Sequence, residues 1–457
     1  RVSGSKASDQ SARVFYVRRP EMETAEEKRS FLASNLARNL SFDEVQPDKA
    51  HNWVNLTNND FDTLLSLASK ETKTAKTAAK ERAVFKLYSL GVVTARDEWV
   101  YDDSPQTLGT KVTHLINAYN ADRRKLAVIR NSNKLAGMLD DSIKWSRAVK
   151  KDLINNVEYS FDCGKITASL YRPFVKRCLY FDKQLNEMQY QLDRLFPEYR
   201  GSNPYISLVA GSRLNFSALA GNSIPNYAIY SLDPAQCVPL YRFDAEGNRT
   251  DNITDWGLKQ FQQHYNEITK GADKAKRITK QAIFHYCYAV LYDPLYREKY
   301  ALNLKREFPR IPFYANFWQW AAWGEALMKL HIGYESVEPF GLQRIDTPDE
   351  KARAAGLSPK ALLRTDKDAG IITLDTETML RGIPVDAWNY KLGNRCALEW
   401  VLDQYKEKKP KDSTIREKFD TYRFADYKEK VIDLLTRVTT VSAETVRITQ
   451  AMKQAVR

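Results

Sequence analysis

The chain has 457 residues, of which 43% are hydrophobic and 28% are charged, as in an ordinary folded protein of two or three domains. No apolar run is long enough to cross a bilayer and no secretory signal is recognisable, so a membrane or exported protein is excluded and a cytoplasmic one is expected. The net charge of +13 favours a polyanionic partner, nucleic acid first among them.

The first elements in chain order are a strand over residues 13–18 and a helix over 24–40 that opens with acidic residues. Phe61, Leu64, Leu65 and Ala68 have helical spacing, which predicts that a further helix begins there. The segment that follows carries three lysines at one face of that helical pattern, Lys73, Lys76 and Lys80. Such a face is either simply solvated or contacts phosphate groups.

A long helical region is predicted over residues 108–151, with many arginines and lysines on its surface. Residues 166–240 consist instead of short apolar or aromatic runs interrupted by Gly, Pro, Asn and Asp, which is typical of strands and loops. After Trp256 the pattern becomes helical again, and the last such region, residues 399–457, is highly charged. The fold class expected is mixed α/β of the α+β kind, rich in helix.

Residues 281–335 hold aromatic-rich helices joined by a turn that Pro309 and Pro312 stiffen. The final helix of this stretch has one apolar stripe, formed by Phe317, Trp320, Ala321, Gly324, Leu327 and Met328. These side chains are expected to form a helical core, and none of them suggests a catalytic site.

Several long blocks occur in an order that resembles the C-terminal half of type ISP restriction–modification enzymes. The blocks are LYSLGVVTARDEWVY with the later LINAYN, YRPFVKRCLYFDKQLNEMQYQLDRLFP, ITDWGLKQF, residues 281–335, and WNYKLGNRCALEWVLDQY. Enzymes of this family join nuclease, translocase, adenine methyltransferase and target-recognition parts in one polypeptide.

The resemblance implies three domains: the tail of a methyltransferase-like α/β domain over residues 1–60, a helical connector over 61–160, and a DNA target recognition domain over 161–457. The last would have a small strand-rich region and helical flanks. The implied function is sequence-specific recognition of double-stranded DNA, which positions the duplex for methylation or cleavage by domains outside this chain. The alternative is a helical scaffold or protein-interaction module of a phage-defence complex that does not read bases.

The motifs of the family's chemistry are missing from the sequence. The nearest match to the N-P-P-Y motif of adenine methyltransferases is a single Asn203-Pro204 pair in a turn, and no G-x-x-x-x-G-K-[ST] phosphate loop occurs. Whether the chain is itself an enzyme therefore stays open, and no cofactor is expected in it. S-adenosylmethionine, ATP and Mg²⁺ are implied for the parent enzyme, whose methyltransferase, helicase and nuclease domains would be its partners.

A nuclease core of the P-D…[DE]-x-K type is the third possibility. The residue types that this motif requires are present as Pro384, Asp386, Glu407 and Lys409. The residues around Glu407 and Lys409, however, are better explained as the lysine-rich end of a helix. The five cysteines and five histidines show no zinc spacing. No catalytic or metal-binding residue is predicted.

DNA contacts are expected from the strand-and-loop region, because loops can enter a groove and vary in sequence. Arg213, Asn215 and Asn222 stand beside flexible glycines and are predicted to contact bases. Phosphate contacts are predicted for two groups of cations, Lys73, Lys76 and Lys80 in the connector and Arg172, Lys176 and Arg177 beside rigid aromatics.

Overall fold

The computed structural model describes residues 13–19, 23–47, 53, 57, 59–129, 139–197, 202–209, 215–230, 233–268 and 277–457. It divides into two compact units, residues 1–63 and residues 64–457.

The first unit is a small hairpin with one helix. Strand β1 (Val14–Tyr16) pairs antiparallel with β2 (Asp43–Val45), and helix α1 (Ala25–Ser34) lies between them in sequence. Thr24 and Glu27 form a reciprocal capping box that fixes the start of α1. The strand and the acidic-capped helix predicted here are therefore both present, but the helix ends at Ser34 and a 3₁₀ turn at Ala37–Asn39 follows it.

The second unit contains most of the strands, gathered in several small sheets. Two of these sheets have four strands each, ordered β10-β6-β7-β5 and β4-β11-β8-β9. Strands β6 to β11 lie within residues 166–240, the region that the sequence predicted to be rich in strands, whereas β4 and β5 precede it. These strands are β4 (Ser89–Leu90), β5 (Tyr101–Asp102), β6 (Ile166–Arg172), β7 (Val175–Tyr180), β8 (Tyr205–Leu208), β9 (Ala218–Gly221), β10 (Ile224–Pro225) and β11 (Gln236–Pro239). Short two-stranded pairs are formed by β3 (Leu65–Ser66) with β14 (Arg310–Ile311), β12 (Tyr241–Phe243) with β13 (Arg249–Asp251), and β19 (Lys391–Leu392) with β20 (Arg395–Cys396).

Helices surround these sheets. They are α2 (Lys70–Thr74), α3 (Asp97–Val100), α4 (Pro105–Ile129), α5 (Arg147–Ile154), α6 (Asp255–Ile268), α7 (Lys280–Tyr292), α8 (Pro294–Lys299), α9 (Ala301–Leu304), α10 (Phe317–Ile332), α11 (Glu350–Ala354), α12 (Val385–Asn389), α13 (Ala397–Gln404), α14 (Ser413–Lys418) and α15 (Phe424–Lys453). None of the helices in the described ranges is long and apolar enough to cross a membrane.

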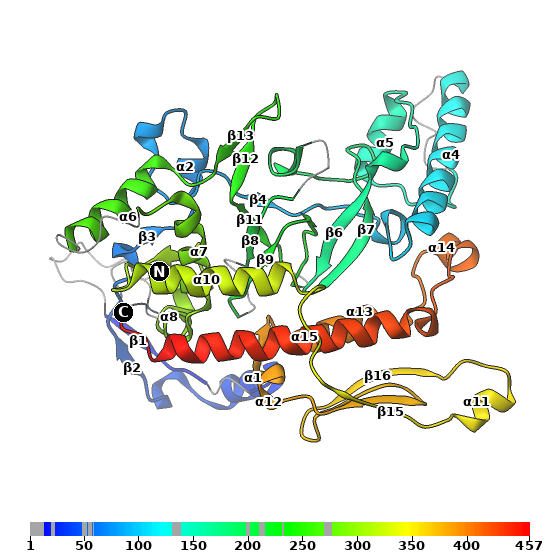
Figure 1. Ribbon diagram of the computed structural model, residues 1–457. Coiled ribbons are helices and arrows are strands. Elements are labelled where there is room, and N and C mark those ends of the chain that lie inside the picture. Colours follow the sequence, from blue (N-terminus) through cyan, green and yellow to red (C-terminus); the bar gives the residue numbers. More distant parts are fainter. Residues whose placement is uncertain are drawn as a thin grey trace. The chain divides into compact units, whose positions relative to one another are not determined.

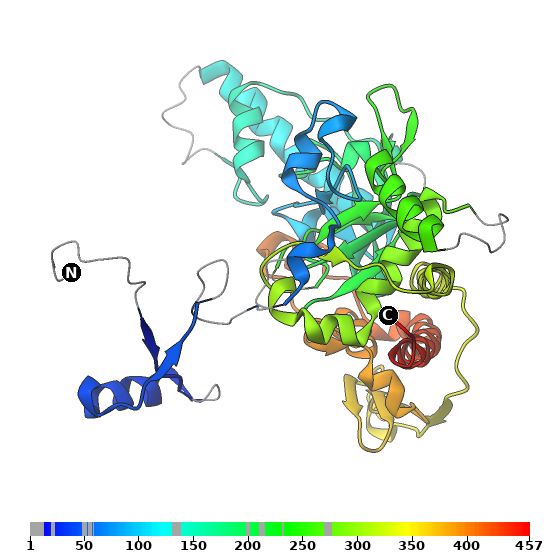
Figure 2. The same cartoon turned by 90° about the vertical axis from the view of Figure 1, so that its left-hand side faces the viewer.

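The centre of the second unit is the contact between α7 and α10. All six residues of the predicted stripe on α10 are buried, and α7 is buried along most of its length. Gly324 allows the close approach, since a Cβ atom there would lie 1.8 Å from the carbonyl oxygen of His285. In Figure 2, α10 is seen nearly end-on beside α15.

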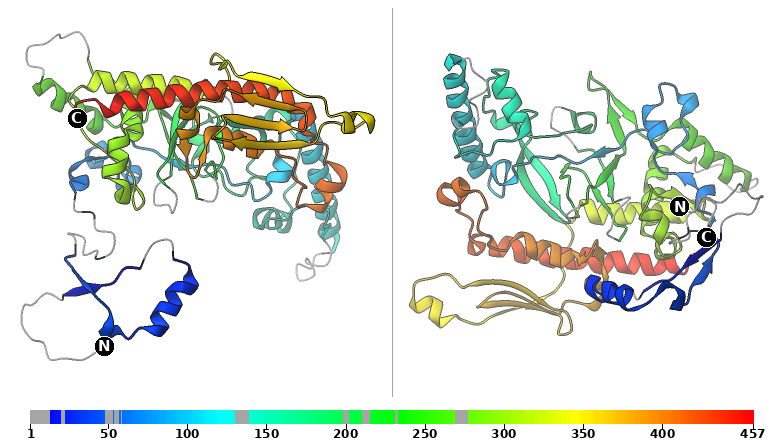
Figure 3. Two further views of the ribbon diagram at one scale, coloured as in Figure 1. Left: turned by 90° about the horizontal axis from the view of Figure 1, so that it is seen from below. Right: turned by 180° about the vertical axis from the view of Figure 1, so that it is seen from behind.

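Helix α15 runs across the second unit and has the α7–α10 pair on one side in Figure 1. On its other side lies a third four-stranded antiparallel sheet, ordered β15-β18-β17-β16. The left view of Figure 3, seen from below, shows this sheet beside α15. Its strands are β15 (Gln343–Asp346), β16 (Ala361–Asp366), β17 (Ile371–Asp375) and β18 (Thr378–Arg381). Helix was expected after Trp256, and for residues 343–381, which hold this sheet, that expectation is wrong.

The helix expected to begin at Phe61 is also wrong. A 3₁₀ turn at Phe61–Thr63 leads into strand β3, and the lysine-bearing segment is split into α2 and a second 3₁₀ turn at Ala78–Lys80. Neighbouring extended segments here are joined by backbone hydrogen bonds and β-bridges. This pairing holds Leu67, Ala68 and Phe85 in buried positions. Tertiary pairing has therefore overridden the local helical spacing.

The region predicted as one helix over 108–151 contains two, α4 and α5, with an irregular segment at residues 139–146 among the described positions. The overall expectation of a mixed, helix-rich α+β fold is confirmed.

Candidate nucleic-acid interface

The residues predicted to contact bases lie at the ends of a buried strand pair. Strands β8 and β9 are antiparallel neighbours, and every residue in both is buried. Asn215 is exposed just before β9, and Asn222 is half-buried just after it. Arg213 lies outside the described residues. A rigid pair of strands thus presents at least Asn215 to solvent, as a residue that reads a groove would require.

The predicted phosphate cations on β6 and β7 point in different directions. Arg172 donates from Nη1 to the Tyr171 carbonyl oxygen at 2.6 Å and to Asn226 Oδ1 at 3.2 Å. Arg177 donates to the Gln404 carbonyl oxygen at 2.9 Å. Lys176 faces the other side of its strand and pairs with Glu335 at 2.5 Å. The structure therefore gives each of these cations a partner inside the chain.

Arg172 and Arg177 flank the ring of Tyr171, with guanidinium carbons 4.1 and 4.9 Å from its centroid. The hydroxyl of Tyr171 donates to Asp97 Oδ2 at 3.0 Å. Burial, reinforced by Asp97, raises the pKa of Tyr171 above its ordinary value, so the phenol stays protonated and the bond to the carboxylate persists at neutral pH.

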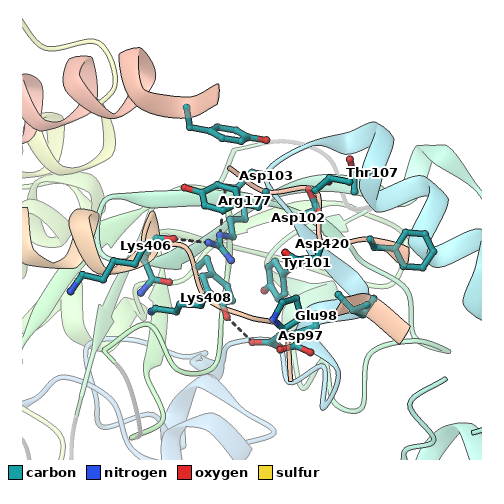
Figure 4. Close-up of a pocket in the computed structure, with 18 of the residues that line it drawn as sticks. Asp97, Glu98, Tyr101, Asp102, Asp103, Thr107, Arg177, Lys406, Lys408 and Asp420 are labelled. Atoms are coloured by element: carbon teal, nitrogen blue, oxygen red, sulfur yellow. Dashed lines mark hydrogen bonds and ion pairs between the residues drawn. The ribbon is translucent and has the colours of Figure 1, made fainter. Parts of the chain in front are cut away.

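The two arginines line a cleft of about 570 Å³ between α3, α4, β7 and the segments on either side of α14. Figure 4 shows Arg177 inside it, with Asp102 and Asp103 on one side and Lys406 and Lys408 on another. Its charged lining consists of Asp97, Glu98, Asp102, Asp103, Asp403, Asp420 and Asp426 together with Lys111, Arg172, Arg177, Arg395, Lys406, Lys408 and Lys409. Carboxylates and cations are equal in number, so the cleft has no net attraction for a polyanion.

Internal ion pairs account for much of this charge. Lys111 Nζ lies 2.8 Å from Asp102 Oδ2, and Arg177 Nε lies 3.6 Å from Asp103 Oδ1. Burial opposes the charge of Arg177, but Asp103 and Tyr171 outweigh it and hold the pKa of the guanidinium above its ordinary value. Burial lowers the pKa of Lys111, and Asp102 offsets part of that change. The first pair joins α4 to β5, and the second joins β7 to the residue that follows β5.

The connector lysines fall into two kinds. The ammonium group of Lys73 donates to the Tyr88 carbonyl oxygen at 2.8 Å and lies 4.2 Å from the centre of the Tyr88 ring. Lys76 and Lys80 are exposed, and neither forms an ion pair with any residue that the structure describes. Lys76 and Lys80 are therefore the connector lysines whose charge is available to a phosphate.

Sequence reasoning did not single out a cationic surface on α5. Lys144, Arg147, Lys150 and Lys151 are exposed there and border a groove of about 500 Å³ that Arg147, Lys150 and Lys151 share with Trp145, Ile154 and Asn155. Ser146 caps the helix by accepting a hydrogen bond from the Val149 backbone. The signal was present as cations at helical spacing around buried Val149 and Leu153.

The catalytic alternatives find no support in the geometry. In the described ranges no three His, Cys, Asp or Glu side chains are placed to share a metal ion. Glu407 accepts a bond from the Phe424 backbone at 2.8 Å, and Lys408 pairs with Asp403 at 3.2 Å. Of the possible nuclease motif, Glu407 thus has a structural partner, as does Lys408 beside the motif's own lysine, Lys409.

His331 is the most deeply buried histidine among the described positions. Its Nδ1 lies 2.6 Å from the Tyr288 hydroxyl and its Nε2 lies 2.9 Å from Thr445 Oγ1. Burial first, and the charge of Arg297 second, lower its pKa to about 3. A neutral imidazole with both nitrogens occupied joins α7, α10 and α15.

Comparisons with known proteins place this architecture. The family model of the Type ISP C-terminal specificity domain matches residues 83–434. A search of curated proteins gives no match. Among solved structures, the chain is similar to a DrdV–DNA complex determined by cryo-electron microscopy, with 47% identity and a TM-score of 0.86 over 97% of this chain and 44% of that one.

Two further structures show the same fold. One is a nuclease-deletion mutant of the Type ISP restriction–modification enzyme LlaGI in complex with a DNA substrate mimic, with 24% identity and a TM-score of 0.78 over 97% of this chain and 39% of that one. The other is the ATP-dependent Type ISP enzyme LlaBIII bound to DNA, with 22% identity and a TM-score of 0.72 over 91% of this chain and 26% of that one. The chain thus spans less than half the length of each of these three solved chains. With residues 83–434 matched, it belongs to the Type ISP C-terminal specificity domain family, as the sequence resemblance indicated.

Proposed function

We propose that the chain recognises double-stranded DNA by sequence and positions it for methylation or cleavage by other domains of a restriction–modification enzyme. The observation that carries the proposal is the 47% identity with DrdV, solved as a DNA complex, across 97% of this chain. Identity at that level over almost the whole chain supports a function shared with that relative.

The charge distribution supports the same function. The net charge is +13, and because the cleft around Arg177 is balanced, the available positive charge lies elsewhere. Lys76, Lys80 and the α5 surface are exposed and suited to phosphate groups, which position a duplex without reading it. Asn215 and Asn222, with Arg213 between β8 and β9, are proposed to contact base edges.

We further propose the domain roles that the sequence suggested: residues 1–60 as the end of a methyltransferase-like domain, 61–160 as a connector and 161–457 as the recognition domain. A unit boundary after Thr63 supports the first division. The methyltransferase, helicase and nuclease domains, with S-adenosylmethionine, ATP and Mg²⁺, would belong to the parent polypeptide, which acts on DNA in the cytoplasm.

The test is selection of bound duplexes from a randomised pool, followed by footprinting and titration across salt concentrations. Sequence-specific recognition predicts enrichment of one short site and a steep decline of affinity with salt. A scaffold that does not read bases would enrich no site. That result, or the absence of duplex binding at low ionic strength, would contradict the proposal.

A further inference from the structure

One short loop of the second unit carries two large exposed side chains, one a flexible methionine and the other an aromatic tyrosine. Met188 is 43% exposed and Tyr190 is 39% exposed, whereas Gln189 between them is buried. Met188 and Tyr190 therefore both reach solvent on either side of a buried residue. Exposed apolar side chains held side by side are typical of a contact surface.

The backbone at Tyr190 is in the left-handed region, with φ of 51°. This conformation is unfavourable for a bulky L residue and persists only where the surroundings impose it. Phe174 and Leu363 share the positive φ, but both are buried, so packing accounts for them. Tyr190 has its ring at the surface, where packing alone gives no reason for a strained aromatic residue.

The loop is fixed on both sides. Met188 exchanges two backbone hydrogen bonds with Val93, at 2.9 and 3.0 Å, and the Gln191 amide donates to Ser89 Oγ at 3.1 Å. The Gln189 side chain donates to Asn186 Oδ1 at 3.0 Å. The backbone that carries the exposed side chains is therefore held in place before any partner arrives, which reduces the entropy lost on binding.

A second ring supports Tyr190 from behind. Tyr227 lies near-parallel to it, with centroids 6.5 Å apart and an interplanar angle of 17°. The Tyr227 amide donates to the Val92 carbonyl oxygen at 3.0 Å, so both rings are attached to the same backbone segment. The pair forms a platform with a defined orientation.

Positive charge flanks this platform. Glu187, adjacent to Met188, accepts a bond from the Ala148 amide at 3.3 Å and lies 3.7 Å from Arg147 Nε, which brings the cationic face of α5 beside the loop. On the other side, Arg194 lies 3.5 Å from Gln191 Oε1. Aromatic rings among cations are the combination that holds nucleic acid through base faces and phosphates.

Building on the proposed function, we propose that Tyr190, with Met188 beside it, stacks on the face of a nucleobase in bound DNA, while the cations of α5 hold the adjacent phosphates. Because every base has a π-face, this contact adds affinity without reading sequence. Apolar side chains that reach base faces in a duplex do so by unstacking one base step. The loop therefore marks where the duplex is opened or bent.

The test uses the 457-residue chain and its selected duplex. Affinity is measured by titration, and unstacked thymines are detected by their reaction with permanganate. In a series of duplexes, a thymine is placed in turn at each position of the site that is not one of the recognised bases. Tyr190→Gly removes the ring and also the backbone strain. It is expected to weaken binding about 5- to 150-fold, to abolish the permanganate-sensitive thymine and to leave the melting temperature unchanged or higher. Tyr190→Trp, which keeps an aromatic face, should retain both binding and the sensitive thymine.

Phe161→Ala is the matched control, because Phe161 is 38% exposed and its ring also stacks on a tyrosine, Tyr180, at 5.7 Å. It should bind like the wild type. Tyr190→Asn, whose side chain tolerates a positive φ, provides a second variant that should lose affinity while folded.

The outcomes are separable from those of the proposed function. Wild-type affinity in Tyr190→Gly and Tyr190→Asn, or the absence of any sensitive thymine in the wild-type complex, overturns the stacking role and leaves DNA recognition standing. A lower melting temperature with unchanged affinity identifies Tyr190 as a packing residue and also overturns it. Failure of the wild-type chain to bind any duplex overturns both.

Discussion

Trp99 and Asp412 are joined by a hydrogen bond of 2.8 Å from the indole Nε1 to carboxylate Oδ2, although 313 positions separate them in sequence. Beside it, the Glu98 carboxylate accepts the backbone amides of Lys411 and Asp412, each at 2.9 Å. These bonds hold the lysine-rich segment that precedes α14 against α3. Both elements also line the cleft around Arg177.

Trp99→Phe should loosen that segment. The substitution removes one donor to a charged acceptor, and we expect the free energy of unfolding to fall by about 1.5–3 kcal/mol, measured by urea denaturation. Trypsin should cut faster after Lys408 and Lys411 under native conditions, whereas the Lys409–Pro410 bond resists trypsin. Trp323→Phe on α10 is the control, and equal cleavage rates in the two variants would contradict the role assigned to the Trp99–Asp412 bond.

The double variant Lys76→Ala/Lys80→Ala should weaken DNA binding to the same extent on all sequences. If each lysine neutralises one phosphate, the slope of log affinity against log salt should become shallower by about 2. Lys73→Ala should change the slope less, because its ammonium is already bonded to Tyr88. Lys329→Ala, an exposed lysine paired with Glu325 on α10, is the control, and an unchanged slope in the double variant would leave the two lysines as solvated surface.

Asn215→Ala should affect the selected site more than random DNA. Loss of a base contact costs about 1–3 kcal/mol of discrimination, whereas loss of a phosphate contact affects both duplexes alike. Parallel titrations of the two duplexes measure the difference. An equal loss on both would remove Asn215 from the residues that read bases.

Gly324→Ala should destabilise the second unit strongly. A Cβ atom at this position would lie 1.8 Å from the His285 carbonyl oxygen, so α7 and α10 would have to separate, at a cost of about 3 kcal/mol or more. Gly341→Ala is a matched control, since nothing lies within 4 Å of a Cβ atom there. Denaturation midpoints that shift equally in both variants would show that the helices do not depend on this close approach.

His331 should make stability fall in mild acid. Its pKa in the folded chain is about 3 and that of an unfolded histidine is about 6.5, so the unfolded state binds the extra proton between these values. The contribution is complete above pH 6.5 and decreases by about 1.4 kcal/mol per pH unit as the pH falls toward 3. In His331→Gln the urea midpoint should depend less on pH between 6.5 and 4.5, and an identical pH dependence in the two proteins would show that His331 does not titrate in this way.

Sequence reasoning succeeded where the signal was local. The stripe on α10 has a clear period of 3.6, and its residues are buried as expected. The β15–β18 sheet had a local signal too, because hydrophobic and polar residues tend to alternate from Ile371 to Arg381. This stretch is bounded by the turn glycines Gly370 and Gly382, both of which have positive φ. That signal was overlooked because helical patterns surround it.

The functional surface was harder to predict, because the sequence does not show which cations are already paired. Arg177 bonds to Gln404, 227 positions away, and Lys176 to Glu335, 159 positions away. Both partners follow from tertiary folding. The same applies to Tyr190, because its neighbours Met188 and Gln191 bond to Val93 and Ser89, which are far away in the sequence.

The complete burial of β8 and β9 has an evolutionary consequence under the proposed function. Because every residue of β8 and β9 is buried against the rest of the unit, substitutions in the loop that connects them need not alter that packing. A lineage could then acquire a new target by a few substitutions. If methylation of the host's chromosome and cleavage of an invader's DNA both depend on this one recognition surface, the same substitutions would change the target of both activities. The cell would then not cut its own genome.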